Sequence, residues 1–151
     1  MKHTYEATIV WNGAGTSTAA YASYSREYGA RMNGKPDLTG SADPSFRGDA
    51  RLYNPEDLLL ISLSACHMLS YLAICARKGI EIVSYEDRAS GTMAVREGAM
   101  RFVEVVLRPH VVVPGGATIE HETYHEQAHR ECFIANSVNF TVRHEARTVA
   151  G

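Results

Sequence analysis

The sequence is poor in cysteine, in net charge and in targeting signals. Three cysteines among 151 residues are too few, and odd in number, for a disulfide framework. In a reducing compartment, such cysteines are more often catalytic or inert than structural. The net charge is −2 and no basic block occurs, which gives nucleic-acid binding little support. Because Met1–Glu6 lacks the apolar stretch of a secretory signal, we expect a cytoplasmic protein.

The length predicts a single domain that spans residues 1–151. A chain of this size can bury roughly two-thirds of its unfolded surface, so a core is feasible without disulfides or metals. Apolar residues make up 45% of the chain and charged residues 21%, which is typical of a soluble globular protein.

One segment stands out because it has no charged residue at all, namely Leu58–Ala76. Asn54 and Pro55 before it are typical of a helix start, and Gly79 after it is typical of a helix end. The segment is long enough to cross a bilayer, but its serines and His67 and the lack of an aromatic belt argue against that interpretation. A helix that is apolar all round can equally lie in a protein core. In so small a chain, strands or a second subunit must then wrap it.

The remaining pattern predicts strands before this helix, and strands and a polar helix after it. Expected strands are residues 4–11, 19–24, 35–38, 82–95, 100–113 and 139–147, with a turn at 12–15, an irregular loop at 40–51, a polar helix at 118–130 and a short helix at 132–138. Helices and strands do not alternate regularly, so the fold class is α+β.

The cysteines fall into two groups by helical geometry. Cys66 and Cys75 are nine residues apart, about 900° of helical rotation, so they face opposite sides and cannot form a disulfide. Cys132 is under no such restriction. A thiol buried at position 66 is either inert or kept ionised by a neighbouring cation, for which an arginine is best suited. Arg47 and Arg51, just before the helix, are the candidates, and a carboxylate at the helix start could hold either one.

The residues around Cys66 resemble a known family. The run Asn54-Pro55-Glu56-Asp57-Leu58-Leu59, then Ser64-Ala65-Cys66, with Cys132 far downstream, is similar to the OsmC/Ohr family of osmotically inducible and organic hydroperoxide resistance proteins. The run Ser45-Phe46-Arg47-Gly48-Asp49 resembles the OsmC-type branch.

This resemblance implies a fold, an activity and site residues. The fold would have antiparallel sheets wrapping a long buried central helix in an intertwined homodimer. The activity would be a thiol-dependent peroxidase that reduces organic hydroperoxides, with Cys66 as the peroxidatic and Cys132 as the resolving cysteine. Glu56 would orient an arginine, which is Arg47 or alternatively Arg51. The reductant would be a dithiol, often a lipoylated protein or dihydrolipoamide, and no metal or flavin cofactor would be needed.

Two alternatives stay open. His121-Glu122-Thr123-Tyr124-His125 matches H-E-x-x-H, in which two histidines and a glutamate serve a zinc hydrolase. Glu145 could be a distant third ligand, whereas a solvated polar helix is the plainer interpretation of this stretch. The other alternative is a non-catalytic protein of the same fold that binds a hydrophobic ligand between subunits.

Overall fold

The computed structural model describes residues 1–116 and 121–151. It contains helices α1 (Pro55–Arg77) and α2 (His121–Glu131) and strands β1 (Thr8–Trp11), β2 (Tyr28–Arg31), β3 (Leu38–Gly40), β4 (Ser84–Asp87), β5 (Ser90–Arg96), β6 (Ala99–Leu107), β7 (Pro109–Val113), β8 (Thr141–His144) and β9 (Arg147–Ala150). Two short 3₁₀ helices, η1 (Pro44–Phe46) and η2 (Ala135–Ser137), complete the described elements. The chain divides into two compact units, Met1–Leu59 and Leu60–Gly151, and the predicted α+β class is confirmed.

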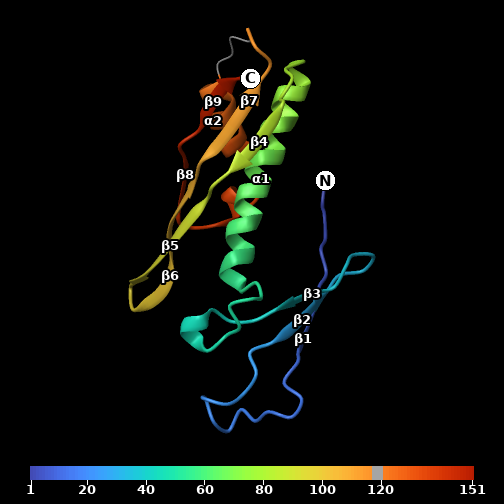
Figure 1. Cartoon of the computed structure of the whole chain (residues 1–151), viewed down its shortest axis with the longest axis vertical. Helices are drawn as coiled ribbons and strands as arrows, with labels where there is room; N and C mark the ends of the chain where they lie inside the picture. The colour runs from blue at the N-terminus through green and yellow to red at the C-terminus, as the bar shows by residue number, and fades with distance from the viewer. Residues whose placement is uncertain (117–120) are drawn as a thin grey trace. The chain divides into compact units, whose positions relative to one another are not determined.

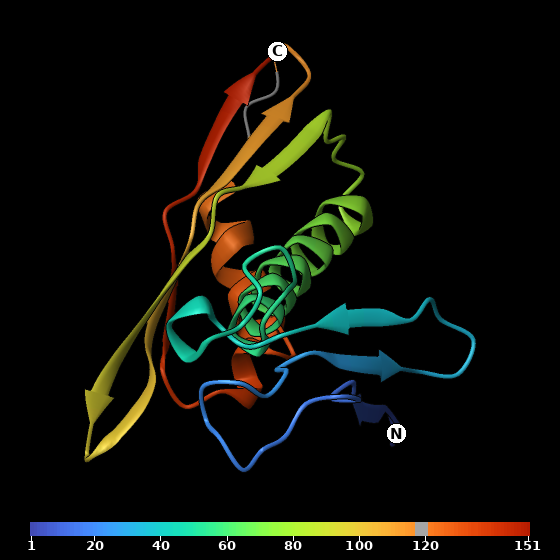
Figure 2. The same cartoon turned by 60° about the horizontal axis from the view of Figure 1, so that its bottom comes forward.

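The first unit contains an antiparallel sheet in the order β1-β2-β3, and β2 and β3 lie side by side in Figure 2. The strand expected at residues 19–24 is wrong, because the partner of β1 is β2. The segment between them is a folded loop. The indole N–H of Trp11 donates to the Ser25 carbonyl at 2.7 Å, and the Arg26 guanidinium lies 3.6 Å from the Tyr24 ring centroid. These contacts hold residues 19–24 in turns rather than in a strand.

Helix α1 begins and ends as its sequence predicts. The Asn54 side chain accepts from the Asp57 N–H at 2.8 Å, and the Asp57 side chain accepts from the Asn54 N–H at 3.1 Å, a reciprocal cap of the first turn. Gly79 has a φ of +68°, and the Ile80 N–H donates to the Cys75 carbonyl at 2.9 Å. This is a Schellman motif, which glycine favours because its left-handed backbone carries no Cβ penalty.

One stripe of α1 is buried in the second unit, consisting of Leu63, His67, Tyr71, Ile74 and Cys75. By length and composition α1 could cross a membrane, yet only 28% of its most apolar window is buried within this chain. Leu69 is 63% exposed and Ile61 48% exposed. Within a single chain, α1 is therefore buried on one side only, whereas the sequence predicts burial on all sides.

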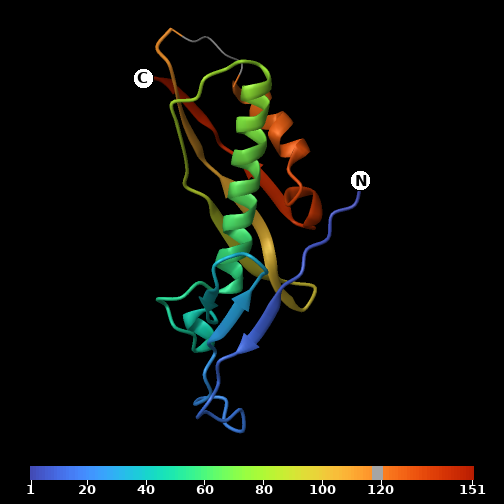
Figure 3. The ribbon, with the colours of Figure 1, turned by 90° about the vertical axis from the view of Figure 1, so that its right-hand side faces the viewer.

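The strands of the second unit form two three-stranded sheets, in the orders β4-β7-β9 and β5-β6-β8, which run along α1 (Figures 1 and 3). The strand expected at 82–95 is split after Asp87, and the strand at 100–113 is split before Pro109. The strand expected at 139–147 is shorter, namely β8, and a further strand, β9, begins at Arg147. Asp87 stands opposite Pro109, whose nitrogen has no hydrogen to donate to the ladder. The expected antiparallel arrangement holds for β4-β7 and β5-β6, whereas β8 and β9 join their sheets in parallel.

Helix α2 packs beside α1, and the core cluster lies between α1, β7 and α2 (Figure 2). The cluster comprises Tyr71, Ile74, Cys75, Val111, Val113 and Ala128. The predicted polar helix is confirmed from His121 onward, and its expected start at residue 118 lies outside the described residues. The short helix expected at 132–138 is reduced to η2.

Candidate functional site

The two cysteines singled out by the sequence meet in the second unit. Cys66 lies in the middle of α1 and Cys132 directly follows α2. The packing of α2 against α1 brings their thiols within hydrogen-bonding reach of each other. Cys75 instead belongs to the hydrophobic core, as expected from its position nine residues along the same helix.

The two thiols have different surroundings. Cys132 is 1% exposed, and its sulfur accepts from the Ala135 N–H at 3.4 Å. Burial, opposed in part by that hydrogen bond and reinforced by the neighbouring Cys66 thiol, raises the pKa of Cys132 to about 11. Cys66 is only half-buried. At neutral pH Cys132 is therefore a protonated thiol, and Cys66 is the sulfur that a solute can approach.

Cys66 opens into a cavity of about 740 Å³. Apolar side chains of α1 and the exposed ring of Phe133 form much of its wall, and Arg77, Arg130 and Glu131 supply charge. Arg77 is ion-paired with Glu131 at 3.2 Å, which ties the end of α1 to the end of α2. Such a cavity suits a small organic molecule with an apolar body.

The other predicted site residues, Arg47, Arg51 and Glu56, belong to the first unit. Arg51 forms a two-pronged pair with Asp49, with N–O distances of 3.0 and 2.7 Å. Arg47 is exposed in a left-handed conformation, with a φ of 66°, at the end of η1. Among residues 1–116 and 121–151, neither Arg47 nor Glu56 forms an ion pair within the chain.

A stack of buried aromatic rings that the sequence did not predict joins α1 to α2. His67 Nε2 and His125 Nδ1 are 3.0 Å apart, and the Tyr71 hydroxyl is hydrogen-bonded to His121 Nδ1. The rings of Tyr71 and His125 stack with centroids 4.1 Å apart. His121 and His125 are thus buried, so α2 is not the fully solvated helix that its composition predicts.

One signal in the sequence matches this stack. His67 and Tyr71 are four residues apart on α1, and His121 and His125 are four residues apart on α2. Residues at this spacing share one helix face, so two antiparallel helices can pair them two by two. The observed pairs, His67 with His125 and Tyr71 with His121, follow that rule.

The zinc interpretation of H-E-x-x-H does not fit this geometry. In the part of the chain that the structure describes, no group of three His, Cys, Asp or Glu side chains is placed to hold a metal ion. Glu145, the expected third ligand, pairs instead with Arg143 and Arg108. The two histidines serve helix packing instead.

The two thiols of the site differ in accessibility, and this difference determines the chemistry that the site can perform. One thiol faces a cavity, and a second, less accessible thiol lies in contact with it. A solute that oxidises the first sulfur leaves it next to a partner with which it can form a disulfide.

Comparison with known proteins shows which family this chain resembles. The sequence model of the family described as OsmC-like protein matches residues 48–147. An OsmC-like protein of unknown function from Vibrio cholerae has a structure similar to this chain, with a TM-score of 0.90 and 30% identity over 97% of this chain and 100% of that one. An organic hydroperoxide resistance protein from Elizabethkingia anophelis shares the fold, with a TM-score of 0.69 and 19% identity over the whole of both chains.

Among curated proteins, an uncharacterized protein of Bacillus subtilis, YmaD, is 26% identical over 84 residues. That match covers 56% of this chain and about half, 54%, of the relative. The family match spans residues 48–147, a range in which Cys66 and Cys132 both lie, and the likeness to the Vibrio cholerae structure covers 97% of this chain. The chain therefore belongs to the OsmC-like protein family.

Proposed function

We propose that this protein is a thiol-dependent peroxidase that reduces organic hydroperoxides. The observation that carries the proposal is the contact between a half-buried Cys66, open to a largely apolar cavity, and a buried Cys132. Family membership supports it, since relatives of this fold include proteins named for organic hydroperoxide resistance.

The reaction has three balanced steps. The Cys66 thiolate attacks one oxygen of R–O–O–H, which breaks the O–O bond, leaves Cys66 as a sulfenic acid and releases an alkoxide that becomes the alcohol. The Cys132 thiol then condenses with the sulfenic acid, forming a disulfide and water. A dithiol reductant, such as dihydrolipoamide or a lipoylated protein, restores both thiols by exchange and is itself oxidised to a disulfide.

The first step needs a cation beside the sulfur, because a thiol in apolar surroundings is a poor nucleophile. By resemblance to the family we assign this role to an arginine oriented by Glu56. Arg51 is held on Asp49 by two of its three guanidinium nitrogens, whereas Arg47 has no such pair among the described side chains, which favours Arg47. Arg47→Ala should lower kcat/KM for cumene hydroperoxide by about 10²-fold, as expected for loss of a charge-stabilising donor, and Arg51→Ala by far less.

We further propose that the active form is a cytoplasmic homodimer. The apolar side chains of α1 that this chain leaves exposed, Ile61 and Leu69, would be covered by the second copy. A helix of this composition is expected to be covered in the folded protein.

The test is a dithiol-coupled assay of cumene hydroperoxide consumption. Cys66→Ser should abolish turnover, Cys132→Ser should permit at most one turnover per chain, and Cys75→Ser should leave the rate unchanged. Cys75 is the matched control because it is a buried cysteine of the same helix. Absence of turnover with every dithiol tried would instead favour the non-catalytic, ligand-binding alternative.

A further inference from the structure

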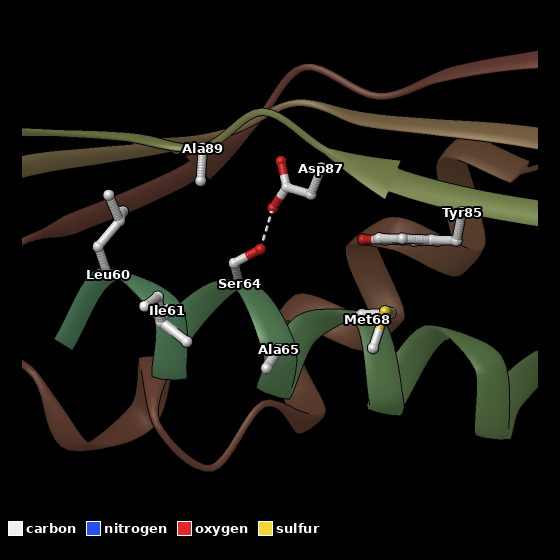
Figure 4. Close-up of a pocket in the computed structure, with 8 residues that line it drawn as sticks. All are labelled: Leu60, Ile61, Ser64, Ala65, Met68, Tyr85, Asp87 and Ala89. Carbon is white, nitrogen blue, oxygen red and sulfur yellow. Dashed lines mark hydrogen bonds between the residues drawn. The ribbon is translucent and has the colours of Figure 1, made fainter. Parts of the chain in front are cut away.

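The two cysteines of the site are held by different kinds of structure. Cys66 belongs to helix α1, and two residues earlier the Ser64 hydroxyl donates to Asp87 Oδ2 at 2.5 Å, the dashed line in Figure 4. This hydrogen bond ties α1 to the end of β4, so regular structure fixes the backbone that carries Cys66. Cys132 directly follows α2 and has no helix or strand of its own, so its position depends on the turn that contains it.

Asn136 closes the turn that contains Cys132. The Asn136 backbone N–H donates to the Cys132 carbonyl at 3.0 Å, and the Asn136 side-chain Nδ2 donates to the Arg130 carbonyl at 3.0 Å. The last carbonyls of a helix have no partner within the helix, so a side chain that reaches one of them fixes the path by which the chain leaves the helix. Asn136 therefore anchors the end of α2 and the backbone of Cys132 together.

The same turn also holds the Cys132 sulfur. The N–H of Ala135, the residue before Asn136, donates to Cys132 Sγ at 3.4 Å, and this sulfur lies within hydrogen-bonding reach of the Cys66 thiol. Cys132 is 1% exposed, and close packing leaves a buried side chain little room for another rotamer. Residues 135 and 136 thus hold both ends of Cys132, the carbonyl and the sulfur.

We propose that Asn136 is a positioning residue that holds Cys132 against Cys66. This inference rests on the proposed peroxidase, in which the Cys132 thiol attacks the Cys66 sulfenic acid. That step forms the S–S bond, breaks the S–O bond and releases water, with the thiol proton leaving on the hydroxyl group. A disulfide needs a narrow range of sulfur positions, so releasing Cys132 should slow this step. The earlier attack of Cys66 on the peroxide does not involve Cys132 and should keep its rate.

The kinetic test mixes the reduced full chain with one equivalent of cumene hydroperoxide and follows peroxide loss and disulfide formation separately. Asn136→Ala removes the side-chain donor and should slow disulfide formation about fivefold, with peroxide loss unchanged. Asn136→Asp has nearly the same size, but its ionised side chain cannot donate, so disulfide formation should slow at least as much. Ser137→Ala is the matched control and should change neither rate, since the Ser137 hydroxyl donates to the Phe133 carbonyl at 2.7 Å in the same turn.

A second measurement makes the test independent of peroxide chemistry. Equilibration with reduced and oxidised glutathione gives the effective concentration of the Cys66 and Cys132 thiols. Asn136→Ala should lower this effective concentration about fivefold, and Ser137→Ala should not change it. If the parent protein consumes no peroxide but this loss is still seen, the peroxidase fails and the positioning role holds. The positioning role is overturned if the two variants give the same effective concentration, or if Asn136→Ala slows peroxide loss as much as disulfide formation.

Discussion

At the scale of single residues, the three cysteines should differ strongly in reactivity. Cys132 has its pKa raised to about 11 by burial, and Cys75 lies in the core with its pKa also raised by burial, whereas Cys66 opens into a cavity. We expect iodoacetamide at pH 7 to alkylate Cys66 at least tenfold faster than either of the others, because the thiolate is the reactive form. Peptide mapping by mass spectrometry measures the order. Equal rates at Cys66 and Cys132 would contradict the asymmetry.

The buried histidines should make stability depend on pH. Burial first, then repulsion by neighbouring imidazoles, lowers the pKa of His67 to about 4 and that of His125 to about 3. Their unfolded pKa is near 6.5, so the unfolded chain binds more protons between these values. Their contribution is therefore complete above pH 6.5 and is lost as the pH falls toward 4, which should cost about 3 kcal/mol of unfolding free energy for each of the two histidines.

Urea unfolding at pH 7 and at pH 4.5 checks this dependence. A His67→Phe variant should lose part of it, because one of the titrating rings is gone. His110→Gln is the control, since His110 is exposed on β7 and should leave the dependence intact. If the unfolding free energy of the parent protein is the same at both pH values, the buried histidines do not make its stability depend on pH.

The residue-level predictions differ in how far the sequence could support them. Helical geometry was enough to separate Cys75 from Cys66, because residues nine positions apart on one helix lie on opposite faces. The contact between Cys66 and Cys132 depends on how α2 packs against α1, which spacing alone does not determine. The buried histidines of α2 were not predicted, because a polar composition is typical of a solvated helix face. Here His125 stacks on His67 and Tyr71, and this packing places that face of α2 inside the protein.

At the scale of elements, the cap of α1 offers a direct test. Asn54 is 7% exposed and shares two hydrogen bonds with Asp57 in the first turn. Asn54→Ala removes the side-chain acceptor and should lower the unfolding free energy by about 1 kcal/mol. Chemical denaturation measures the loss. Glu56→Gln is the comparison, because it keeps the cap and should change stability much less.

Helix α1 could be predicted because its start and stop signals are local, whereas the ends of several strands could not. Asn54, Pro55 and Gly79 act within one turn, so their effect can be determined from the sequence. The strand pattern at 82–95 and 100–113 correctly marks extended chain, yet both strands are broken opposite each other, at Asp87 and Pro109. That break depends on which strands are paired, and pairing is not a local property.

At the scale of the whole molecule, the first unit needs a covering surface. In the described residues, every fully buried apolar side chain of the core lies beyond residue 59, while Ile9 in β1 is 63% exposed. A segment without an apolar core of its own is stabilised by packing elsewhere. With the exposed apolar residues of α1, this predicts a homodimer.

Sedimentation velocity should give twice the chain mass of 16.6 kDa at micromolar concentration. Ile9→Asp should shift the protein toward monomer, because a charge replaces an apolar contact. Thr8→Asp on the opposite face of the same strand should shift it much less. A monomer in the parent protein would rule out the dimer.

The central claim is that Cys66 and Cys132 form one redox pair, and its most direct test is a titration of the reduced protein with cumene hydroperoxide followed by mapping of the disulfide. One equivalent should be consumed per chain, both thiols should disappear together, and the only new bond should join Cys66 to Cys132. A Cys66–Cys75 bond, or loss of the peroxide without any disulfide, would contradict the account.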